Sequence, residues 1–307
     1  MVELKETKIR REVSKGMICA AKEIGLGELF VKKDEKEILD LTEITDAPLG
    51  TPLAEALEMN DVLIDVDNKS MTHRPDLWGH YGMAREVAAI FGKDLKKYHP
   101  KEIHEAKKLN IVVDVQEKKL CPRYMAVAVN GIEVQPSPTW MQAKLRAVGL
   151  TPKNNIVDIT NYVMLELGQP MHAFDADRLK NSGDEIFISV KKAKQGEKFT
   201  SLGGDEHELG AEMLMITDAK NSIAIAGVKG GEESGVTEKT QSIVFEAANF
   251  DPVSVRRTST ALGLRTDASA RFEKSLDPNM VELALRRAVE LVQELCPGAQ
   301  VVSNVAD

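Results

Sequence analysis

Residues 155–175, NIVDITNYVMLELGQPMHAFD, place polar side chains inside an otherwise apolar segment, and this stretch constrains the fold more than any other. Its β-branched first part, residues 156–160, favours a strand. Residues 161–167 favour one or two helical turns, which a glycine and a proline then end. The chain should therefore fold back on itself here. Because Pro170 restricts the backbone just before His172, we expect an ordered loop that presents this histidine between apolar neighbours.

Thr160, Asn161 and His172 are the polar residues of this stretch that need an explanation. From the residues alone, a half-buried histidine that only hydrogen-bonds a backbone carbonyl is the commoner outcome, and a pocket-lining histidine is the alternative. No metal site is expected, since His73 and His80 lie seven residues apart without a third ligand nearby.

The chain of 307 residues is long enough to bury a substantial core, and 43% of it is hydrophobic. The sequence has no apolar run long enough to span a membrane and no apolar segment behind its charged start, so we expect neither a membrane span nor a secretory signal. A cytoplasmic location follows. Three widely spaced cysteines indicate buried thiols, neither a disulfide framework nor a zinc site.

The net charge of −8 bears on the choice of partner, because proteins that bind nucleic acid through its phosphates usually carry a basic face. Short basic runs occur at residues 8–11, 93–101 and 256–257, and solvated helix faces and linkers account for most of them. We therefore expect the chain by itself to bind nucleic acid weakly.

Alternating apolar residues and turn formers predict a series of short strands from residue 109 onward, and apolar positions three or four apart predict packing helices between and after them. The expected strands cover residues 109–115, 125–129, 185–191, 213–217, 222–226 and 242–248. The expected helices begin near Asp76, Ser137, Asp251 and Asp277.

Glycines follow the predicted strand 222–226, in the sequence GVKGG of residues 227–231. A phosphate loop does not fit, because Lys229 is followed by glycine instead of serine or threonine. Two explanations stay open. The glycines allow the backbone to approach a ligand closely, or they serve a tight turn that needs positive φ.

The strand at residues 242–248 places Glu246 on the same face as Val244 and Ala248. A buried carboxylate is costly unless it has a partner. From the residues alone, an ion pair with an arginine such as Arg271 is the favoured explanation, and contact with a polar ligand group is the alternative.

Several collinear motifs resemble one known family. NIVDITNYVMLELGQPMHAFD, GVKGGEESGV and IVFEAANFDPVSVRRTSTALGLRTDASARFEKSLDP are similar to the editing module of the bacterial-type phenylalanyl-tRNA synthetase beta subunit. The likeness covers about two hundred residues, from about residue 108 to the end of the chain. Chance similarity over several ordered motifs is far less probable than a match to one short pattern.

The resemblance implies an α+β fold, with a mixed-sheet editing domain and packed helices over residues 108–307 and a small helical domain over residues 49–107. Residues 1–48 resemble the C-terminal remnant of the family's tRNA-binding module, an oligonucleotide-binding-fold barrel. Five strands cannot be made from so short a piece. Arg11 stands where the family usually has glycine, so no binding function is assigned to this remnant.

The resemblance also implies site residues at the matching positions. His172 and Asn161 would be catalytic, by orienting water or the terminal ribose near the ester. Glu246 would accept a hydrogen bond from a substrate hydroxyl, and Gly230 would let the backbone approach the substrate. The full set expected to bind substrate is Glu246, Gly230, Thr160, Thr266 and Ala268.

The implied activity is ester hydrolysis that removes tyrosine wrongly attached to tRNA(Phe). A pocket built for an apolar ring cannot strongly reject an added hydroxyl, whereas a second pocket that hydrogen-bonds this hydroxyl disfavours the ligand lacking it by ~10⁴-fold. Editing would need no cofactor, and ATP and Mg²⁺ would serve only the complete synthetase. The expected partners are tRNA(Phe) and, in a full-length chain, the alpha subunit, with no membrane contact.

Two alternatives stay open: a non-catalytic scaffold that binds tRNA or a partner subunit, and a free-standing hydrolase that edits mischarged tRNA in trans. The family's catalytic-core-like and anticodon-binding modules would follow Asp307, and no aminoacylation signature occurs in the sequence. The chain alone is therefore not expected to charge tRNA.

Overall fold

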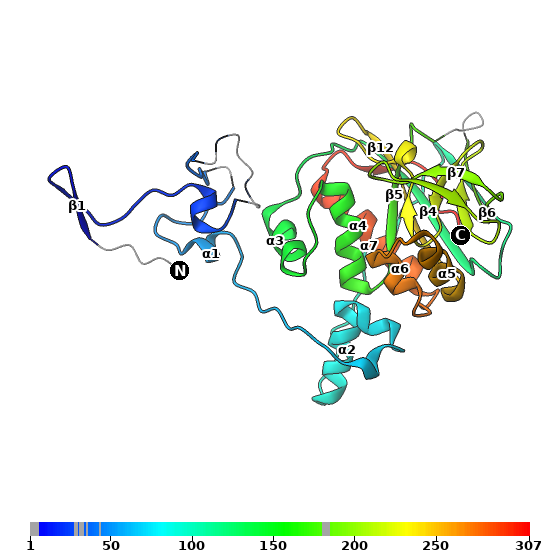
Figure 1. Ribbon diagram of the computed structural model, residues 1–307, viewed down its shortest axis with the longest axis horizontal. Coiled ribbons are helices and arrows are strands. Elements are labelled where there is room, and N and C mark those ends of the chain that lie inside the picture. Colours follow the sequence, from blue (N-terminus) through cyan, green and yellow to red (C-terminus); the bar gives the residue numbers. More distant parts are fainter. Residues whose placement is uncertain (1–5, 28–29, 31–33, 35, 43, 180–184) are drawn as a thin grey trace. The chain divides into compact units, whose positions relative to one another are not determined.

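The structure is a computed structural model, and it describes the chain except for residues 1–5, 28–29, 31–33, 35, 43 and 180–184 (Figure 1). The chain folds into two compact units. Unit 1 comprises residues 1–64 and 138–151, and unit 2 comprises residues 65–137 and 152–307. The domain boundaries expected from the sequence, after residues 48 and 107, stay a prediction.

Unit 1 contains a short antiparallel hairpin of β1 (Thr7–Ile9) and β2 (Glu12–Ser14). Its other elements are a 3₁₀ turn (Ala21–Ile24), α1 (Leu53–Ala56) and α3 (Thr139–Ala147). Arg10 and Arg11 form the hairpin turn with φ of 51° and 80°. Two positive φ angles are typical of the two-residue turn that best matches the twist of the strands, and glycine adopts them most easily.

Unit 2 is built around two sheets and a hairpin. The five-stranded sheet has the order β11–β10–β9–β6–β3, and the four-stranded sheet has the order β13–β4–β12–β5. β3 runs parallel to β6 and the other pairs are antiparallel, so the first sheet is mixed, as predicted. The strands are β3 (Asn110–Val115), β4 (Arg123–Asn130), β5 (Met171–Asp175), β6 (Glu185–Lys192), β7 (Glu197–Thr200), β8 (Glu206–Leu209), β9 (Leu214–Thr217), β10 (Ser222–Ile225), β11 (Lys229–Gly230), β12 (Ser242–Asn249) and β13 (Gln300–Val301), with β7 and β8 forming the hairpin.

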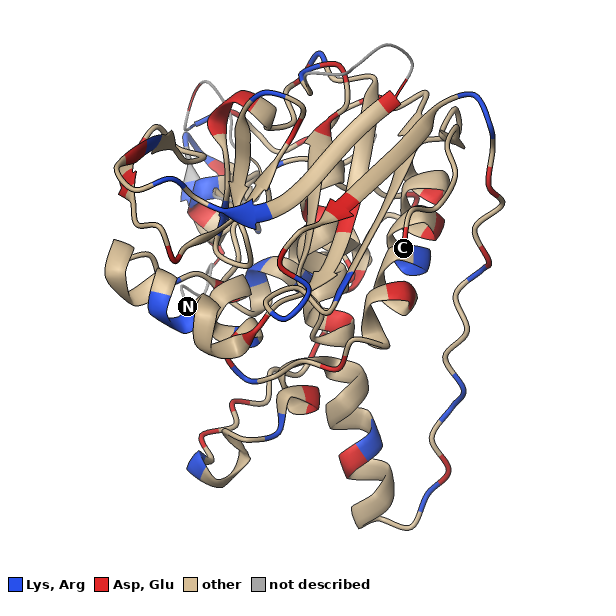
Figure 2. Cartoon of the chain, turned by 90° about the vertical axis from the view of Figure 1, so that its right-hand side faces the viewer, with Lys and Arg blue, Asp and Glu red and all other residues tan. Residues whose placement is uncertain are grey.

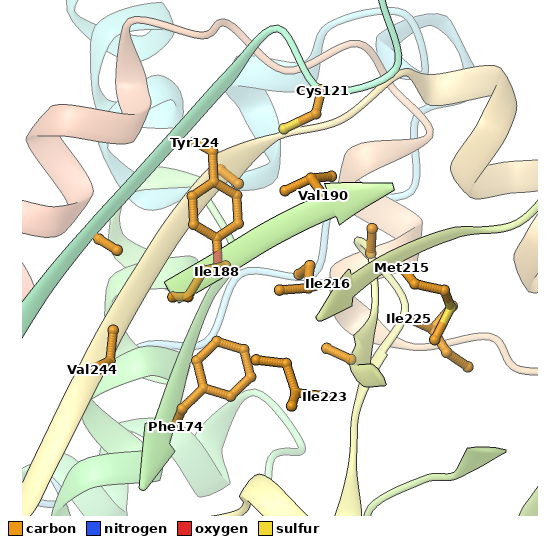
Figure 3. Close-up of a cluster of buried hydrophobic side chains, with 14 of the residues drawn as sticks. Cys121, Tyr124, Phe174, Ile188, Val190, Met215, Ile216, Ile223, Ile225 and Val244 are labelled. Atoms are coloured by element: carbon orange, nitrogen blue, oxygen red, sulfur yellow. The ribbon is translucent and has the colours of Figure 1, made fainter. Parts of the chain in front are cut away.

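The main core lies between the two sheets (Figure 3). Phe174 and Val244 from the four-stranded sheet pack in one buried cluster with Ile188 and Ile216 from the five-stranded sheet. All four side chains are at most 2% exposed. Any polar group on this inner face is therefore surrounded by apolar side chains, and this sets the electrostatics of the candidate site.

Helices cover the other face of the four-stranded sheet. α4 (Asn155–Leu167) packs along α7 (Met280–Leu295), and α7 contacts both β12 and β4 (Figure 1). The alternate residues of the sheet that face away from the inner core, such as Val127 and Phe245, are fully buried. The remaining helices of unit 2 are a 3₁₀ turn (Lys69–Met71), a 3₁₀ turn (Pro75–Trp78), α2 (His80–Ile90), a 3₁₀ turn (Glu232–Ser234), α5 (Pro252–Leu262) and α6 (Asp267–Phe272).

The predicted strand at residues 156–160 is wrong, because α4 is helical throughout. Asn154 caps the helix by accepting hydrogen bonds from Ile156 N and Val157 N, and Gly168 ends it with a φ of 79°. Buried residues recur along one face, as a packed helix requires. They are Ile156, Ile159, Thr160, Val163, Met164 and Leu167. β-branched propensity is a weak preference, and the two caps and this apolar face outweigh it.

Three smaller predictions also need correction. His172 lies on a strand, β5, instead of a loop. The helix expected from Asp76 is interrupted at Gly79, where the 3₁₀ turn ends and α2 begins. Asp76 accepts hydrogen bonds from Arg74 and Arg85 instead of capping the helix. The strand at His172 depends on a partner distant in sequence, because β5 pairs with β12.

Candidate functional site

The two central residues of the candidate site face each other across a strand pair. Glu246 on β12 is directly opposite His172 on β5 and directly opposite Ala126 on β4. Residues opposite one another in an antiparallel pair lie on the same face of the sheet. The carboxyl and the imidazole therefore share the inner face, where the His172 ring stands edge-on to Phe174 with ring centres 4.5 Å apart.

Glu246 is a buried carboxyl with no charged partner in the described part of the chain. The residue is only 5% exposed, and burial raises the pKa of its carboxyl from the ordinary 4.5 to about 8. The nearby Tyr124 hydroxyl moderates this rise, because it favours the charged form. At neutral pH the carboxyl is therefore mostly protonated, and it can both donate and accept a hydrogen bond.

Arg271 does not pair with Glu246, so the ion pair favoured from the residues alone is wrong. The guanidinium donates to Trp78 O at 3.2 Å, to Asp267 O at 3.0 Å and to Asp267 Oδ1 at 3.2 Å. Arg271 thereby joins α6 to the 3₁₀ turn before α2. Asp267 lies four residues before Arg271, and Trp78 lies far from it in the sequence. The alternation of side chains along a strand predicts neither contact.

His172 makes no hydrogen bond with the described residues, and its Nε2 is fully buried. Burial lowers the pKa of the imidazole from 6.5 to about 4, so the ring is neutral at physiological pH. A base this weak takes up a proton poorly at neutral pH, whereas an efficient general base has a pKa near the working pH. The geometry favours orientation of a ligand or water by Nε2 over proton transfer.

Gly230 lies against the histidine ring. A Cβ at this position would be 2.7 Å from His172 Nε2, which is inside van der Waals contact. The positive φ of 69° belongs instead to Gly227. The two explanations left open for the glycines therefore apply to different residues: Gly227 makes the turn and Gly230 allows the close approach.

Thr266 and Ala268 lie at the start of α6. Thr266 caps this helix by accepting from Ser269 N at 3.0 Å, and its hydroxyl donates to Val228 O at 2.9 Å. That bond fastens α6 to the turn that leads into Gly230. Ala268 is half-buried against the inner core.

Thr160 and Asn161 are not hydrogen-bonded to this cluster. The Thr160 hydroxyl donates to Val157 O at 2.7 Å inside α4. Asn161 is partly exposed and forms no side-chain hydrogen bond with the described residues. The structure thus brings together His172, Glu246 and Gly230, and attaches Thr266 to them through the main chain, while the placement of Thr160 and Asn161 in the site stays a prediction.

Tyr124 is a residue that the sequence analysis missed. It pairs with Ala248, two positions from Glu246 on the same face, and its residue is 2% exposed. Neither Tyr124 Oη nor Glu246 Oε2 has a hydrogen-bond partner of regular geometry in the described part of the chain. The alternation of side chains along β4 indicates its place. Tyr124 lies two residues before Ala126, which pairs with Glu246, so both side chains lie on the same face of the sheet.

Three buried polar atoms that have no hydrogen-bond partner among the described residues therefore lie on one sheet face: His172 Nε2, Glu246 Oε2 and Tyr124 Oη. An unpartnered buried polar atom costs about 1–3 kcal/mol, and native proteins retain few of them. Among the described residues no group of three or more His, Cys, Asp or Glu side chains could hold a metal ion. A neutral carboxyl, a phenol and a neutral imidazole can donate hydrogen bonds to, or accept them from, hydroxyl and carbonyl groups.

The fold and this cluster define a class of protein: an α+β module with a buried group of neutral polar side chains on the inner face of its four-stranded sheet. Residues 120–297 match the B3/4 domain, so the chain belongs to the B3/4 domain family. Within the described residues, no helix is both long and apolar enough to cross a membrane.

Relatives of the whole chain carry one name. The chain is 49% identical over 294 residues to the phenylalanine–tRNA ligase beta subunit of Solibacter usitatus, covering 96% of this chain and 36% of that protein. It is 43% identical over 312 residues to the subunit of the same name from Clostridium acetobutylicum, covering 100% of this chain and 37% of that protein. The chain thus spans little more than a third of the length of these relatives.

One solved structure is similar at a lower level. It is an N-terminal fragment of the phenylalanyl-tRNA synthetase beta subunit from Pyrococcus horikoshii, with 22% identity, coverage of 66% of this chain and 63% of that chain, and a TM-score of 0.37.

Proposed function

We propose that this chain is an aminoacyl-tRNA editing module that hydrolyses tyrosyl-tRNA(Phe). One observation carries the proposal: His172 and Glu246 are opposed on a buried sheet face, beneath Gly230, with polar atoms that no described residue satisfies. Membership of the B3/4 domain family and the names of the relatives support the choice of substrate. A non-catalytic scaffold would give no reason for these unpartnered atoms.

Glu246 and Tyr124 would form the end of the pocket that recognises the tyrosine hydroxyl. A protonated carboxyl offers one donor and one acceptor, and the substrate phenol can use both. Phenylalanine would leave these groups unpaired in a buried site, and this penalty gives a site of this kind its selectivity. Recognition would thus depend on the neutral form of Glu246, not on a carboxylate.

His172 would act at the other end, where the ester lies. Water attacks the ester carbonyl carbon, the bond from that carbon to the ribose oxygen breaks, and the oxygen takes a proton. The products are free tyrosine and tRNA. Neutral His172 would hold the water or the ribose hydroxyl through Nε2, so that most of its contribution is orientation. The reaction needs no cofactor.

The chain would work as part of a longer beta subunit that assembles with the alpha subunit of a synthetase. ATP and Mg²⁺ would serve only the aminoacylation reaction of that complete enzyme. The expected location of the complete enzyme is the cytoplasm.

The direct test is a deacylation assay with this chain and two substrates, tyrosyl-tRNA(Phe) and phenylalanyl-tRNA(Phe). We expect slow hydrolysis of the tyrosyl ester and far slower hydrolysis of the phenylalanyl ester. The matched variant is His172→Ala, which should lose about tenfold or more in rate while the melting transition stays within a few degrees of the parent. Equal rates on both esters, or no hydrolysis above the spontaneous rate, would contradict the proposal.

A further inference from the structure

A hollow opens beside the strand that carries Gly230. Its volume is about 530 Å³, and its wall includes Gly231, Phe199 from β7 and Ser222 from β10. Five lysine side chains line it: Lys191, Lys192, Lys194, Lys198 and Lys220. None of these residues belongs to the cluster around His172.

The hollow is basic in an acidic chain. Two carboxylates, Glu197 and Glu233, also line it, so its five lysines leave a formal local charge of +3, against a net charge of −8 for the whole chain. Glu197 is engaged in the wall, where it accepts from Ser222 Oγ at 2.5 Å and from Lys194 N at 3.0 Å. Elsewhere basic and acidic residues are interspersed along the chain (Figure 2).

Most of this positive charge is available to a ligand. Lys191, Lys194 and Lys220 form no ion pair with the described residues. Lys192 and Lys198 contact glutamates that are 89% and 64% exposed, at 2.9 Å and 2.8 Å. Exposed ion pairs of this kind contribute little, so a stronger anion can replace them.

The hollow and the His172 cluster share two short segments of main chain. Leu202 N donates to Gly230 O at 2.9 Å, and Ser201 forms a bridge with Gly231. A Cβ on Gly231 would lie 3.1 Å from the Phe199 ring, which lines the hollow, whereas a Cβ on Gly230 would meet His172. Gly230 and Gly231 are consecutive residues about 3.8 Å apart, so the hollow and the His172 cluster meet at neighbouring positions of the main chain.

We infer that this lysine-lined hollow binds phosphate groups of the RNA strand whose aminoacylated end reaches His172. The ester sits on the terminal ribose of tRNA, and the nearest phosphates precede it in the same strand. Lysine ammonium groups neutralise such phosphates and release counterions, which makes the binding salt-dependent. The inference rests on the proposed function for the identity of the ligand.

The experiment measures binding of uncharged tRNA(Phe) by fluorescence anisotropy over a series of KCl concentrations. The test variant is Lys191→Glu with Lys220→Glu, because both side chains line the hollow without an ion pair among the described residues. The control is Lys107→Glu with Lys108→Glu, which makes the same charge change at two exposed lysines outside the hollow. A second probe is the same tRNA without its last four nucleotides.

We expect the test variant to weaken binding about tenfold and to reduce the slope of log K against log [KCl] by about 1.4, or about 0.7 for each lost phosphate contact. The control should change the slope little. Shortening the tRNA should weaken the parent and leave the test variant almost unchanged, since both changes remove the same contacts.

Three results would overturn the inference. The first is an equal loss of tRNA affinity in the test variant and in the control. The second is a test variant that loses as much affinity for the shortened tRNA as for the intact tRNA, and the third is no measurable binding by the parent chain. The proposed function can fail separately, because this assay uses uncharged tRNA. If the test variant binds tRNA more weakly but the chain shows no deacylation, the phosphate-binding role of the hollow is supported and the editing proposal is contradicted. If deacylation is found without the lysine effect, the reverse holds.

Discussion

Two polar clusters on opposite faces of the four-stranded sheet differ in how completely their atoms are satisfied. On the helical face, Glu166 of α4 accepts from Tyr98 Oη at 2.8 Å and from Arg287 Nε of α7 at 3.0 Å. On the inner face, Glu246 has a tyrosine nearby but no cation, and its Oε2 has no partner among the described residues. A carboxyl and a phenol thus join a guanidinium in a structural network on one face, whereas on the other face a carboxyl, a phenol and the neutral His172 imidazole keep unused hydrogen-bonding capacity.

The variant Glu246→Ala should produce the largest effect and tests the inner cluster. We expect the preference for tyrosyl-tRNA over phenylalanyl-tRNA to fall by about 1–3 kcal/mol, because the neutral carboxyl that distinguishes the two esters is lost. Stability should change little, since no charged partner is left behind. Deacylation rates on both esters and a melting curve of the same variant are the measurements. A destabilised variant with its tyrosine preference intact would mean that both clusters are structural.

The pH dependence of stability sharpens the comparison. The folded-state pKa of Glu246, about 8, lies above its ordinary 4.5, so stability falls as the pH rises between these values. His172, with its pKa lowered to about 4 from 6.5, acts in the opposite sense up to pH 6.5. Above that pH Glu246 acts alone, so we expect a loss of about 2 kcal/mol between pH 6.5 and 8.

The control for this pH effect is Glu246→Gln, which keeps the shape of the side chain and cannot ionise. Urea unfolding at pH 6.5 and at pH 8 should show a much smaller difference for the variant than for the parent. If parent and variant lose stability equally, the carboxyl does not carry the proton that its burial implies.

Arg287→Ala tests the helical cluster. Removing the guanidinium leaves Glu166 with Tyr98 alone, and we expect a loss of about 1–2 kcal/mol in unfolding free energy. This loss is smaller than for a fully buried ion pair, because the Arg287 and Glu166 side chains are 19% and 20% exposed and solvent screens their attraction. Urea unfolding measures the loss. The ratio of the two deacylation rates should be unchanged, and a change in that ratio would show that the helical face also shapes the pocket.

Tyr124→Phe should have the smallest effect. Losing one hydrogen bond to the substrate or to Glu246 should lower the preference for the tyrosyl ester by about 1 kcal/mol. The variant should also raise the pKa of Glu246, because the hydroxyl favours the carboxylate. Measuring the carboxyl pKa by ¹³C NMR separates this role from simple packing. An unchanged pKa together with an unchanged rate ratio would remove Tyr124 from the site.

The local sequence pattern correctly predicted most of the strands and helices that are flanked by turn-forming residues such as glycine, proline and aspartate. The strand Ser242–Asn249 and the helix Pro252–Leu262 fall where alternation and a capping aspartate indicated. The segment Asn155–Leu167 was predicted wrongly in its first half, because intrinsic propensity cannot reveal which face a packed helix will bury. His172 was placed on a loop because its strand partner, β12, lies some seventy residues further along the chain.

The sequence by itself determined that Glu246 lies on an apolar strand face, that glycines surround Lys229, and that His172 needs an explanation. Only the tertiary structure decided what these residues contact. Strand pairing places Glu246 opposite His172, and Gly230 lies against the histidine ring. Arg271 donates a hydrogen bond to Asp267 and does not pair with Glu246. The physical reason is that burial and hydrogen-bond partners are properties of the folded chain, and both pKa shifts in the candidate site come from burial.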